Sequence, residues 1–341
     1  MYKEIVVNIN EAETRVAVFE DQTLVELYIE RSLKQRLVGN IYKGKAENVL
    51  PGMQAAFINI GIERNAFLYV DEALPPKTPT DLSDEELGTH RFNPSQPRGS
   101  ISDVIKEGQN LMVQVTKEPI GTKGPRVTTH ITLPGRYLVL MPGVDYVGIS
   151  RRIENDAERD RLRAIADELR NKEYGVIVRT VAEGMEEEEL RQDMLFLTKV
   201  WKKILSRAAT GQVPNLLHQD LELVQRILRD IFTDDVDRLV IDSPFAYDKM
   251  LELLDFIGPQ LKFKTKLMDS EAMLNQYDLE LEIDKALKRK VWLKCGGYLV
   301  IDQVEALTAI DVNTGKYVGT NDLEDTVVKT NLEAAVEIAR Q

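Results

Sequence analysis

An aspartate and an asparagine near the end of the chain are the residues best suited to chemistry. In the segment EALTAIDVNTG, residues 305–315, an apolar run leads to Asp311, and Asn313 follows two positions later. Residues i and i+2 of a strand point to the same face, so the carboxylate and the amide are expected side by side at the buried end of a strand. Such oxygen donors suit a hard divalent cation. The alternative is an Asx-type turn leading into Gly315, and composition leaves the two interpretations even.

Two phenylalanines with nearby lysines form a second candidate set. Phe57 and Phe67 fall in predicted strands separated by a glycine-containing turn, and Lys43 and Lys45 precede them. Small barrels that bind oligonucleotides interleave aromatic and basic residues in this way, to stack bases and neutralise phosphates. The alternative is that both rings belong to the core, and spacing alone favours it because buried Phe is common.

An arginine and a threonine at the end of an apolar run form a third set. The run GVIV leads to Arg179 and Thr180. An arginine at a strand end, followed by a hydroxyl, is able to hold a phosphate through charge-assisted hydrogen bonds. The alternative, a surface salt bridge, is favoured by the residues alone. The same ambiguity applies to Arg151 and to Gly135 in the turn LPGRY.

Composition and length indicate a cytoplasmic globular protein with two to four domains. The 341 residues exceed the usual limit for a single core. No apolar run reaches 18 residues, and the N-terminus lacks the pattern of a signal peptide. One cysteine, Cys295, excludes an internal disulfide framework and a zinc site built on several cysteines. Three widely spaced histidines argue against a histidine-rich metal centre.

The charge distribution leaves room for a basic groove on an acidic protein. A net charge of −12 argues mildly against nucleic-acid binding, because phosphate contacts require Lys or Arg. Basic residues nevertheless cluster at Lys43/Lys45, Lys123/Arg126, Arg151/Arg152 and residues 285–290.

The elements that must position these residues alternate between strands and helices in several small modules. Strands are predicted at residues 4–8, 15–20, 24–30, 136–141, 147–150, 175–180, 238–242, 291–300 and 307–312, with further short strands of a small barrel or sandwich between residues 39 and 129. Helices are predicted at residues 155–171, 185–209, 216–232, 244–254 and from about residue 322. A proline-bearing insertion at residues 72–100 is expected to be irregular.

Taken together, seven segments resemble the bacterial ribonuclease E/G family of endoribonucleases. GNIYKGK, AAFINIGIERNAFL, YLVLMPG, GISRRI, GVIVRT, EALTAIDVNTG and NLEAAVEIARQ occur in the family's order at compatible spacing, over essentially the whole chain. The resemblance implies an α+β multidomain fold. Residues 1–36 and 223–286 would form an RNase H-like subdomain. Residues 37–128 would form an OB-fold RNA-binding domain that carries the insertion, residues 129–222 a 5′-sensor domain, and residues 287–341 part of a DNase I-like catalytic subdomain.

The resemblance also implies roles for individual residues. Phe57 and Phe67 would hold a base near the cleavage point, and Lys123 would contact the RNA. Gly135, Val139, Arg179 and Thr180, with Arg151 nearby, would recognise a 5′-monophosphate. Asp311 would be one of two aspartates that bind a catalytic Mg²⁺, and Asn313 would orient the attacking water or the scissile phosphate.

One departure from the family's pattern bears on activity. The sequence ends at EIARQ, before the segment in which the family places its second metal-binding aspartate, a further arginine of the 5′-phosphate pocket and a Cys-Pro-x-Cys motif that shares Zn²⁺ between subunits. Cys295 lies in a different context and is no substitute. The chain is therefore expected to be a C-terminally truncated member, which puts its activity and its homo-oligomerisation as a dimer or tetramer in doubt.

Three functions follow as hypotheses. The first is a Mg²⁺-dependent endoribonuclease that cleaves single-stranded, AU-rich RNA with a preference for 5′-monophosphorylated ends, in rRNA and tRNA processing and mRNA decay. The second is a catalytically incomplete RNA-binding fragment. The third is a structural or assembly protein that uses the same modules.

Overall fold

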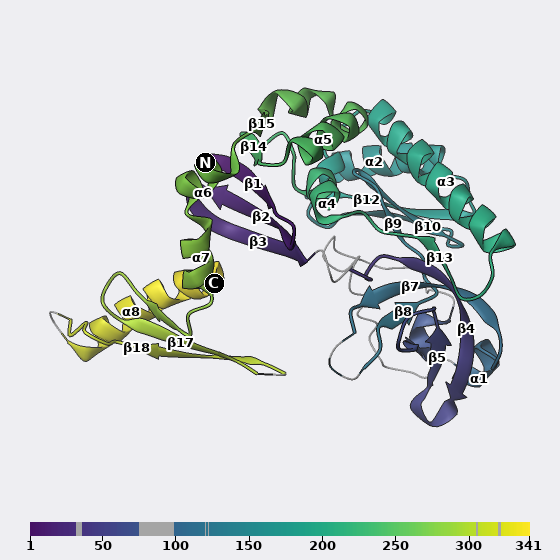
Figure 1. The fold of residues 1–341 in the computed structure, drawn as a ribbon, viewed down its shortest axis with the longest axis horizontal. Coiled ribbons are helices and arrows are strands. Elements are labelled where there is room, and N and C mark those ends of the chain that lie inside the picture. Colours follow the sequence, from purple (N-terminus) through teal and green to yellow (C-terminus); the bar gives the residue numbers. More distant parts are fainter. Residues whose placement is uncertain (32–35, 75–98, 120, 122, 305, 320–321) are drawn as a thin grey trace. The chain divides into compact units, whose positions relative to one another are not determined.

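The fold comprises two compact units, which are described separately. The computed structural model describes residues 1–31, 36–74, 99–119, 121, 123–304, 306–319 and 322–341. Unit 1 contains Met1–Ile29, Asp234–Leu254 and Gly258–Gln341, and unit 2 contains Glu30–Thr233 with Asp255–Ile257. Both units mix helices and strands (Figure 1), so the expected α+β class is confirmed.

Unit 1 is built first on a five-stranded sheet that joins distant parts of the chain. Its order is β15-β14-β1-β2-β3. The strands are β1 (Lys3–Ile9), β2 (Glu13–Glu20), β3 (Thr23–Arg31), β14 (Arg238–Ile241) and β15 (Thr265–Leu267). The continuous apolar run of β1 is buried, as expected for a strand with a parallel neighbour, β14, on one side and the antiparallel β2 on the other. Helices α5 (Pro244–Ile257), α6 (Ser270–Tyr277) and α7 (Leu279–Ala286) follow β14.

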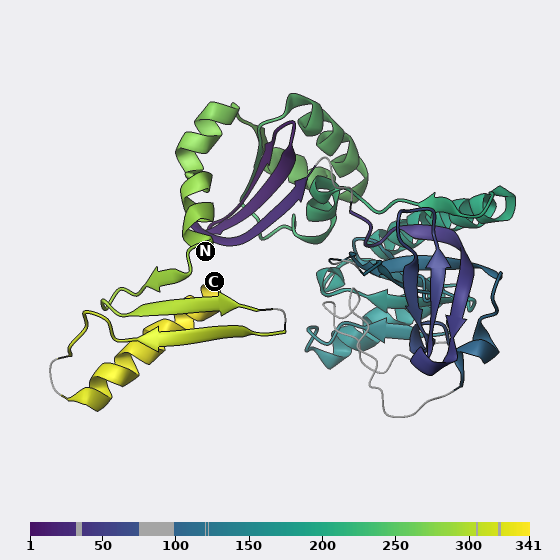
Figure 2. The ribbon, with the colours of Figure 1, turned by 60° about the horizontal axis from the view of Figure 1, so that its bottom comes forward.

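The rest of unit 1 is a three-stranded antiparallel sheet with one helix. The order is β16-β17-β18, formed by Lys290–Trp292, Tyr298–Gln303 and Thr308–Asn313, and α8 spans Leu323–Arg340. Leu299, Val312 and Ala334 belong to one apolar cluster, which places α8 against one face of this sheet (Figure 2).

Unit 2 contains a closed five-stranded barrel. Strands β4 (Ile41–Leu50), β5 (Ala55–Asn59), β6 (Ala66–Tyr69), β8 (Arg126–Thr128) and β7 (Asn110–Lys117) pair in that order, and β7 pairs again with β4. A sixth strand, β13 (Asn215–His218), adds to β4. Alternate residues fill the interior, among them Ala56, Ile58 and Leu68. Short helices η1 (Pro51–Met53), η2 (Val70–Glu72) and α1 (Ile101–Val104) lie in its connections.

The second part of unit 2 is a four-stranded sheet with two long helices. Its order is β11-β12-β10-β9, formed by Val147–Ile149, Tyr174–Val178, Leu138–Pro142 and Leu133–Pro134. Helices α2 (Asp156–Leu169) and α3 (Glu187–Thr210) share its apolar cluster, and η4 (Thr180–Ala182) and α4 (Leu223–Asp230) follow β12 and β13 respectively.

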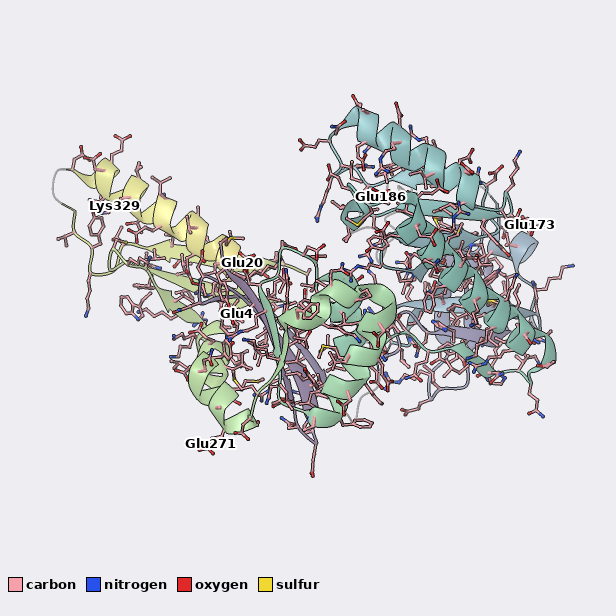
Figure 3. The ribbon with its side chains drawn as sticks, turned by 90° about the horizontal axis from the view of Figure 1, so that it is seen from above. Glu4, Glu20, Glu173, Glu186, Glu271 and Lys329 are labelled. Carbon is pink, nitrogen blue, oxygen red and sulfur yellow. The ribbon has the colours of Figure 1, made fainter. Side chains whose placement is uncertain are left out.

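The spacing of apolar residues in α3 explains why this segment forms a helix that packs on one face. Leu190, Met194, Leu197, Trp201 and Ile204 recur at spacings of three and four and are buried. Glu186 stands at its N-cap (Figure 3), and Glu187, Glu188 and Glu189 occupy its first turn, where carboxylates interact favourably with the helix dipole.

Three expectations about elements were wrong. Residues 216–232 do not form one helix, because residues 215–218 pair with β4 as β13 and only α4 is helical. Residues 291–300 do not form one strand, because β16 ends at Trp292 and the chain turns over residues 293–297 to pair as the antiparallel β17. Helices α6 and α7 are additional elements that the sequence did not predict. Strand β18 is not buried up to Asp311, because it lies at the edge of its sheet and residues 308–311 are exposed.

Residues 75–98 of the predicted insertion and Glu305 of the first motif lie outside the described residues. Among the helices that the structure describes, none combines the length and the apolar character needed to cross a membrane.

Candidate functional site

Phe57 and Phe67 form an aromatic pair on the outer side of the barrel. They are direct cross-strand partners in β5 and β6, and their ring centroids lie 5.9 Å apart in an edge-to-face arrangement at 76°. Their neighbours Ile58 and Leu68 point into the core, so the two rings point away from it and are only half-buried. The interpretation that both are core residues is therefore wrong.

Polar and basic residues surround this aromatic pair. Asn59 and Asn65 each donate a hydrogen bond from Nδ2 to the Glu47 carboxylate, at 2.7 and 2.6 Å. The bond from Asn59, followed by that from Asn65, lowers the pKa of Glu47. Lys45 is exposed on β4, whereas the Lys43 ammonium donates to the Ala208 carbonyl at 2.6 Å and is engaged within unit 2.

Lys123 is exposed on the loop that leads into β8. The following residue, Gly124, passes so close to the barrel that a Cβ atom there would overlap the Asn65 carbonyl. This close approach holds residues 123–125 beside the strand that carries Phe67, and a larger residue at position 124 would move them away.

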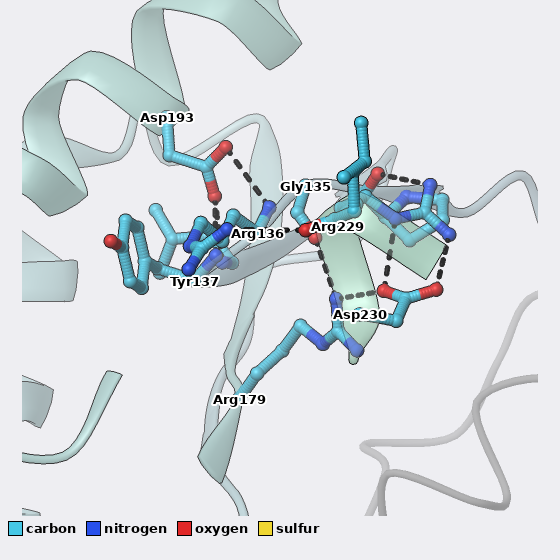
Figure 4. Close-up of polar contacts among 10 residues, drawn as sticks. Gly135, Arg136, Tyr137, Arg179, Asp193, Arg229 and Asp230 are labelled. Atoms are coloured by element: carbon cyan, nitrogen blue, oxygen red, sulfur yellow. Dashed lines mark hydrogen bonds and ion pairs between the residues drawn. The ribbon is translucent and has the colours of Figure 1, made fainter. Parts of the chain in front are cut away.

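Arg179 and Gly135 meet at one end of the four-stranded sheet (Figure 4). Arg179 Nη1 donates to the Gly135 carbonyl at 2.7 Å and to Asp230 Oδ1 at 2.6 Å. Arg229 holds the same carboxylate through Nε at 3.0 Å and Nη2 at 2.9 Å, and donates from Nη1 to the Pro134 carbonyl at 3.0 Å. Asp230 thus links two arginines and the turn that carries Gly135.

The charges of this cluster favour an ionised Asp230. Burial raises the pKa of its carboxyl, but hydrogen bonds and charges from Arg229 and then Arg179 outweigh that effect and lower the pKa overall. The cluster contains three arginines (136, 179 and 229) and two aspartates (193 and 230), an excess of one positive charge. Such an excess suits an anionic ligand.

Asp193 fixes the backbone of the same turn. Its carboxylate accepts the N–H groups of Arg136, Tyr137 and Leu138 at 3.2, 2.8 and 2.9 Å. A Cβ atom on Gly135 would come within 2.5 Å of both carboxylate oxygens, so only glycine fits there without a shift. Burial raises the pKa of Asp193, and the three N–H donors oppose this effect.

The other residues of this set occupy different environments. The Thr180 hydroxyl shares a 2.8 Å hydrogen bond with the buried Ser150 hydroxyl. Val139 is buried among Met141 and Ile177, on the sheet face opposite Leu138 and Leu140. Arg151 is exposed in the turn after β11. Gly135 and Arg179 are therefore in direct contact, and no contact joins Val139 or Arg151 to them among the described interactions.

Asp311 and Asn313 lie side by side on β18, as the i, i+2 spacing predicts. Asn313 Nδ2 donates to Asp311 Oδ2 at 2.9 Å, which leaves Oδ1 and the Asn313 amide oxygen as hard donors on an exposed strand. Within the described residues, no group of three or more His, Cys, Asp or Glu side chains could hold a metal ion. Mg²⁺ often uses only one or two protein carboxylates and retains several waters, so this donor set fits as part of a magnesium site.

Sequence reasoning missed Asp193, Arg229 and Asp230. Asp230 lies 51 positions from Arg179, and Asp193 lies on a long amphipathic helix with many other acidic residues. The one available signal was the Arg-Asp pair at the end of α4, where a buried charge requires a partner.

Comparisons with known proteins match the whole chain. The model of the Ribonuclease E/G family matches residues 132–341. Ribonuclease G of Escherichia coli (strain K12) is 44% identical over 342 residues, which cover 100% of this chain and 68% of that protein. Ribonuclease G of Haemophilus influenzae is 42% identical over 99% of this chain and 67% of its own length. Ribonuclease E of Nostoc sp. (strain PCC 7120) is 41% identical over 100% of this chain and 48% of its own length.

Proposed function

The chain belongs to the ribonuclease E/G family, and we propose that it acts as an endoribonuclease, a hydrolase that cuts phosphodiester bonds within single-stranded RNA. One observation carries the proposal. Asp311 and Asn313 form an exposed, hydrogen-bonded pair of oxygen donors inside the segment that the family model matches. Metal-assisted hydrolysis of RNA requires oxygen donors that hold a cation beside the scissile phosphate, and this pair offers such donors.

Each residue of the pair has a distinct task. Asp311 would hold Mg²⁺, which when bound makes water a better nucleophile and stabilises the charge that develops on the phosphate. The Asn313 amide holds Asp311 Oδ2 and so fixes the direction of Oδ1. Its remaining N–H and its carbonyl oxygen are available to orient the attacking water or a phosphate oxygen.

The barrel supplies binding to single-stranded RNA. Phe57 and Phe67 expose ring surface on which an unpaired base can stack, a contact that tolerates any base, those of AU-rich strands included. Lys123 and Lys45 are exposed and place positive charge on the same barrel. Phosphate contacts of this kind make binding dependent on salt.

Arg179 is proposed to recognise a 5′-monophosphate. Only its Nη1 is engaged among the described contacts, so Nε and Nη2 remain to donate in parallel to a phosphate, the geometry that arginine favours. Thr180 adds a hydroxyl next to it, and Gly135 shapes the turn. Val139 pairs with Pro134, the residue before that turn, and Arg151 adds exposed positive charge.

The family also suggests an assignment of domains and a cellular setting. We assign residues 1–36 and 223–286 to an RNase H-like subdomain, 37–128 to the OB-fold domain, 129–222 to the 5′-sensor and 287–341 to a DNase I-like subdomain. The pairing of β1 with β14 supports the first assignment, and the closed barrel supports the second. The corresponding role is rRNA and tRNA processing and mRNA decay in the cytoplasm, by a homo-oligomer.

The alternative function, RNA binding without cleavage, is favoured by the lack of an acidic cluster around Asp311 within the described residues. The two functions are separated by incubating the chain with Mg²⁺ and an internally labelled, 5′-monophosphorylated single-stranded RNA. Cleavage by the parent and not by Asp311→Asn supports the endoribonuclease. Salt-sensitive binding without cleavage by either protein supports the alternative.

A further inference from the structure

An aromatic row crosses the three-stranded sheet and leads to Asn313. Trp292 of β16 is the cross-strand partner of Tyr298 of β17, and Tyr298 is the partner of Asn313 of β18. Directly opposed residues of antiparallel strands lie on the same face of the sheet. One row therefore contains Trp292, Tyr298 and Asn313. The next row on this face contains Lys290, Val300 and Asp311.

The opposite face of the sheet is the one that packs against α8. Val291, Leu299 and Val312 alternate with the members of the two rows and belong to the apolar cluster that includes Ala334 and Ile338 of α8. The aromatic row is outside that cluster, and Trp292 is 54% exposed. Trp292 therefore does not contribute to the apolar core on the opposite face of the sheet.

The two rings are held in a defined geometry. Their centroids lie 5.3 Å apart with an interplanar angle of 61°, in an edge-to-face arrangement. The Lys290 ammonium lies 4.4 Å from the Trp292 centroid and 3.7 Å from that of Tyr298, and the Lys316 ammonium lies 6.0 Å from Trp292. Cation–π contacts of this kind fix the lysines and keep positive charge beside the rings.

The loop after Asn313 also holds the row in place. Gly315 has a φ of 58°, and a Cβ atom there would come within 2.6 Å of the Gly296 carbonyl and 3.0 Å of the Tyr298 ring. The Lys316 N–H donates to the same carbonyl at 3.0 Å. The turn therefore lies directly against Tyr298 and connects the aromatic row to the Asp311–Asn313 pair.

We propose that Trp292 and Tyr298, with Lys290, form a stacking site for the RNA base next to the phosphate held at Asp311 and Asn313. This inference rests on the proposed function. Neighbouring strands are about 4.8 Å apart, so Trp292 lies two strand spacings, about 10 Å, from Asn313. Exposed aromatic rings beside lysines are the combination that binds unpaired bases and their phosphates.

The inference is tested by binding, without catalysis. An oligouridylate with a 5′-hydroxyl avoids the proposed 5′-phosphate pocket, and EDTA prevents metal-dependent cleavage. Trp292→Ala is expected to weaken binding between about fivefold and a hundredfold, the usual range for loss of one stacked base. Trp292→Phe should retain most of the affinity because it keeps an aromatic face. Phe263→Ala is the matched control, since Phe263 is 91% exposed and lies outside every proposed site.

Fluorescence provides a second readout that does not depend on how the alanine variant folds. The chain has two tryptophans, and Trp201 is buried with 8% exposure, so quenching by RNA reports on Trp292. Quenching in the parent and its loss in Trp292→Phe are expected. Lys290→Gln should reduce the slope of log affinity against log salt by about one.

The outcomes distinguish failure of the stacking site from failure of the proposed endoribonuclease function. Equal binding by the parent and Trp292→Ala, without quenching in the parent, overturns the stacking site and leaves the endoribonuclease intact. A parent that neither binds nor cleaves RNA overturns both.

Discussion

Asp230 determines which nitrogens of Arg179 are available to a ligand. It accepts from Arg179 Nη1, and it is itself fixed by two hydrogen bonds from Arg229. Arg179 therefore has one edge engaged within unit 2 and another edge available. If that edge binds a phosphate, replacement of the arginine should affect only substrates that carry a 5′-phosphate.

We expect Arg179→Ala to lower kcat/KM for a 5′-monophosphorylated RNA by roughly tenfold to a hundredfold, the cost of losing hydrogen bonds to a charged group. Cleavage of the matching 5′-hydroxyl RNA should change little. Arg163→Ala, an exposed arginine of α2, serves as the control. The 5′-sensor assignment is wrong if the preference for the monophosphate survives in Arg179→Ala.

The lowered pKa of Asp230 predicts how stability depends on pH. A carboxyl whose folded pKa lies below its unfolded value of about 3.9 contributes stability above that value and loses it as pH falls through the folded pKa. Asp230→Asn should therefore reduce the free energy of unfolding by about 2 kcal/mol at pH 7. The difference should shrink below about pH 4 in urea titrations of both proteins. An equal difference at pH 7 and pH 3 would contradict the ion-pair interpretation.

At the scale of elements, the sequence predicted correctly those helices and strands whose formation depends on their own hydrophobic periodicity. Strands β1, β2 and β3 and helices α2, α3 and α8 were predicted within a few residues, because each carries its own periodicity. The helix predicted at residues 216–232 failed because the hydrogen bonds of β13 come from Ile41 and its neighbours in β4, which a local pattern does not contain.

The same difference between local pattern and contacts between distant segments applies to the candidate site. The neighbouring positions Asp311 and Asn313 were predicted correctly to lie side by side from the strand period alone. The proximity of Phe57 to Phe67 depends on a short hairpin, but spacing could not decide which face they occupy. Asp193 and Asp230 reach the Gly135 turn from other elements, so nothing near that turn in the sequence indicates them.

The turn at Gly135 offers a test at this scale. Gly135→Ala would bring a methyl group within 2.5 Å of the Asp193 carboxylate, which three backbone N–H groups hold in place. Because this carboxylate is held in place, it cannot move to make room for the methyl group. We therefore expect the free energy of unfolding, measured with denaturant, to fall by about 1–3 kcal/mol. Gly52→Ala is the control, because nothing lies within 4 Å of a Cβ atom there. Equal stability of the two variants would show that the turn can shift.

Over the whole molecule, the net charge of −12 opposes RNA, and binding has to come from local groups. The exposed lysines proposed to contact RNA are Lys45 and Lys123 in unit 2 and Lys290 in unit 1, and Arg151 in unit 2 is the exposed arginine. Affinity should therefore fall steeply with salt even though the protein is acidic. In the proposed function the two units have different roles, because Phe57 lies in unit 2 and Asp311 lies in unit 1.

This division predicts that binding and cleavage respond to different substitutions. Phe57→Ala should weaken RNA binding by about tenfold through loss of stacking and lower kcat/KM to the same degree. Asp311→Asn should abolish most cleavage yet bind RNA in EDTA as the parent does, because it removes a metal ligand and leaves the barrel unchanged. The double variant should show the product of the two losses in kcat/KM, since one substitution removes a stacking contact and the other removes a metal ligand. A binding defect in Asp311→Asn as large as its loss of cleavage would instead assign Asp311 to RNA binding or to the stability of β18, and would remove the main support for the endoribonuclease.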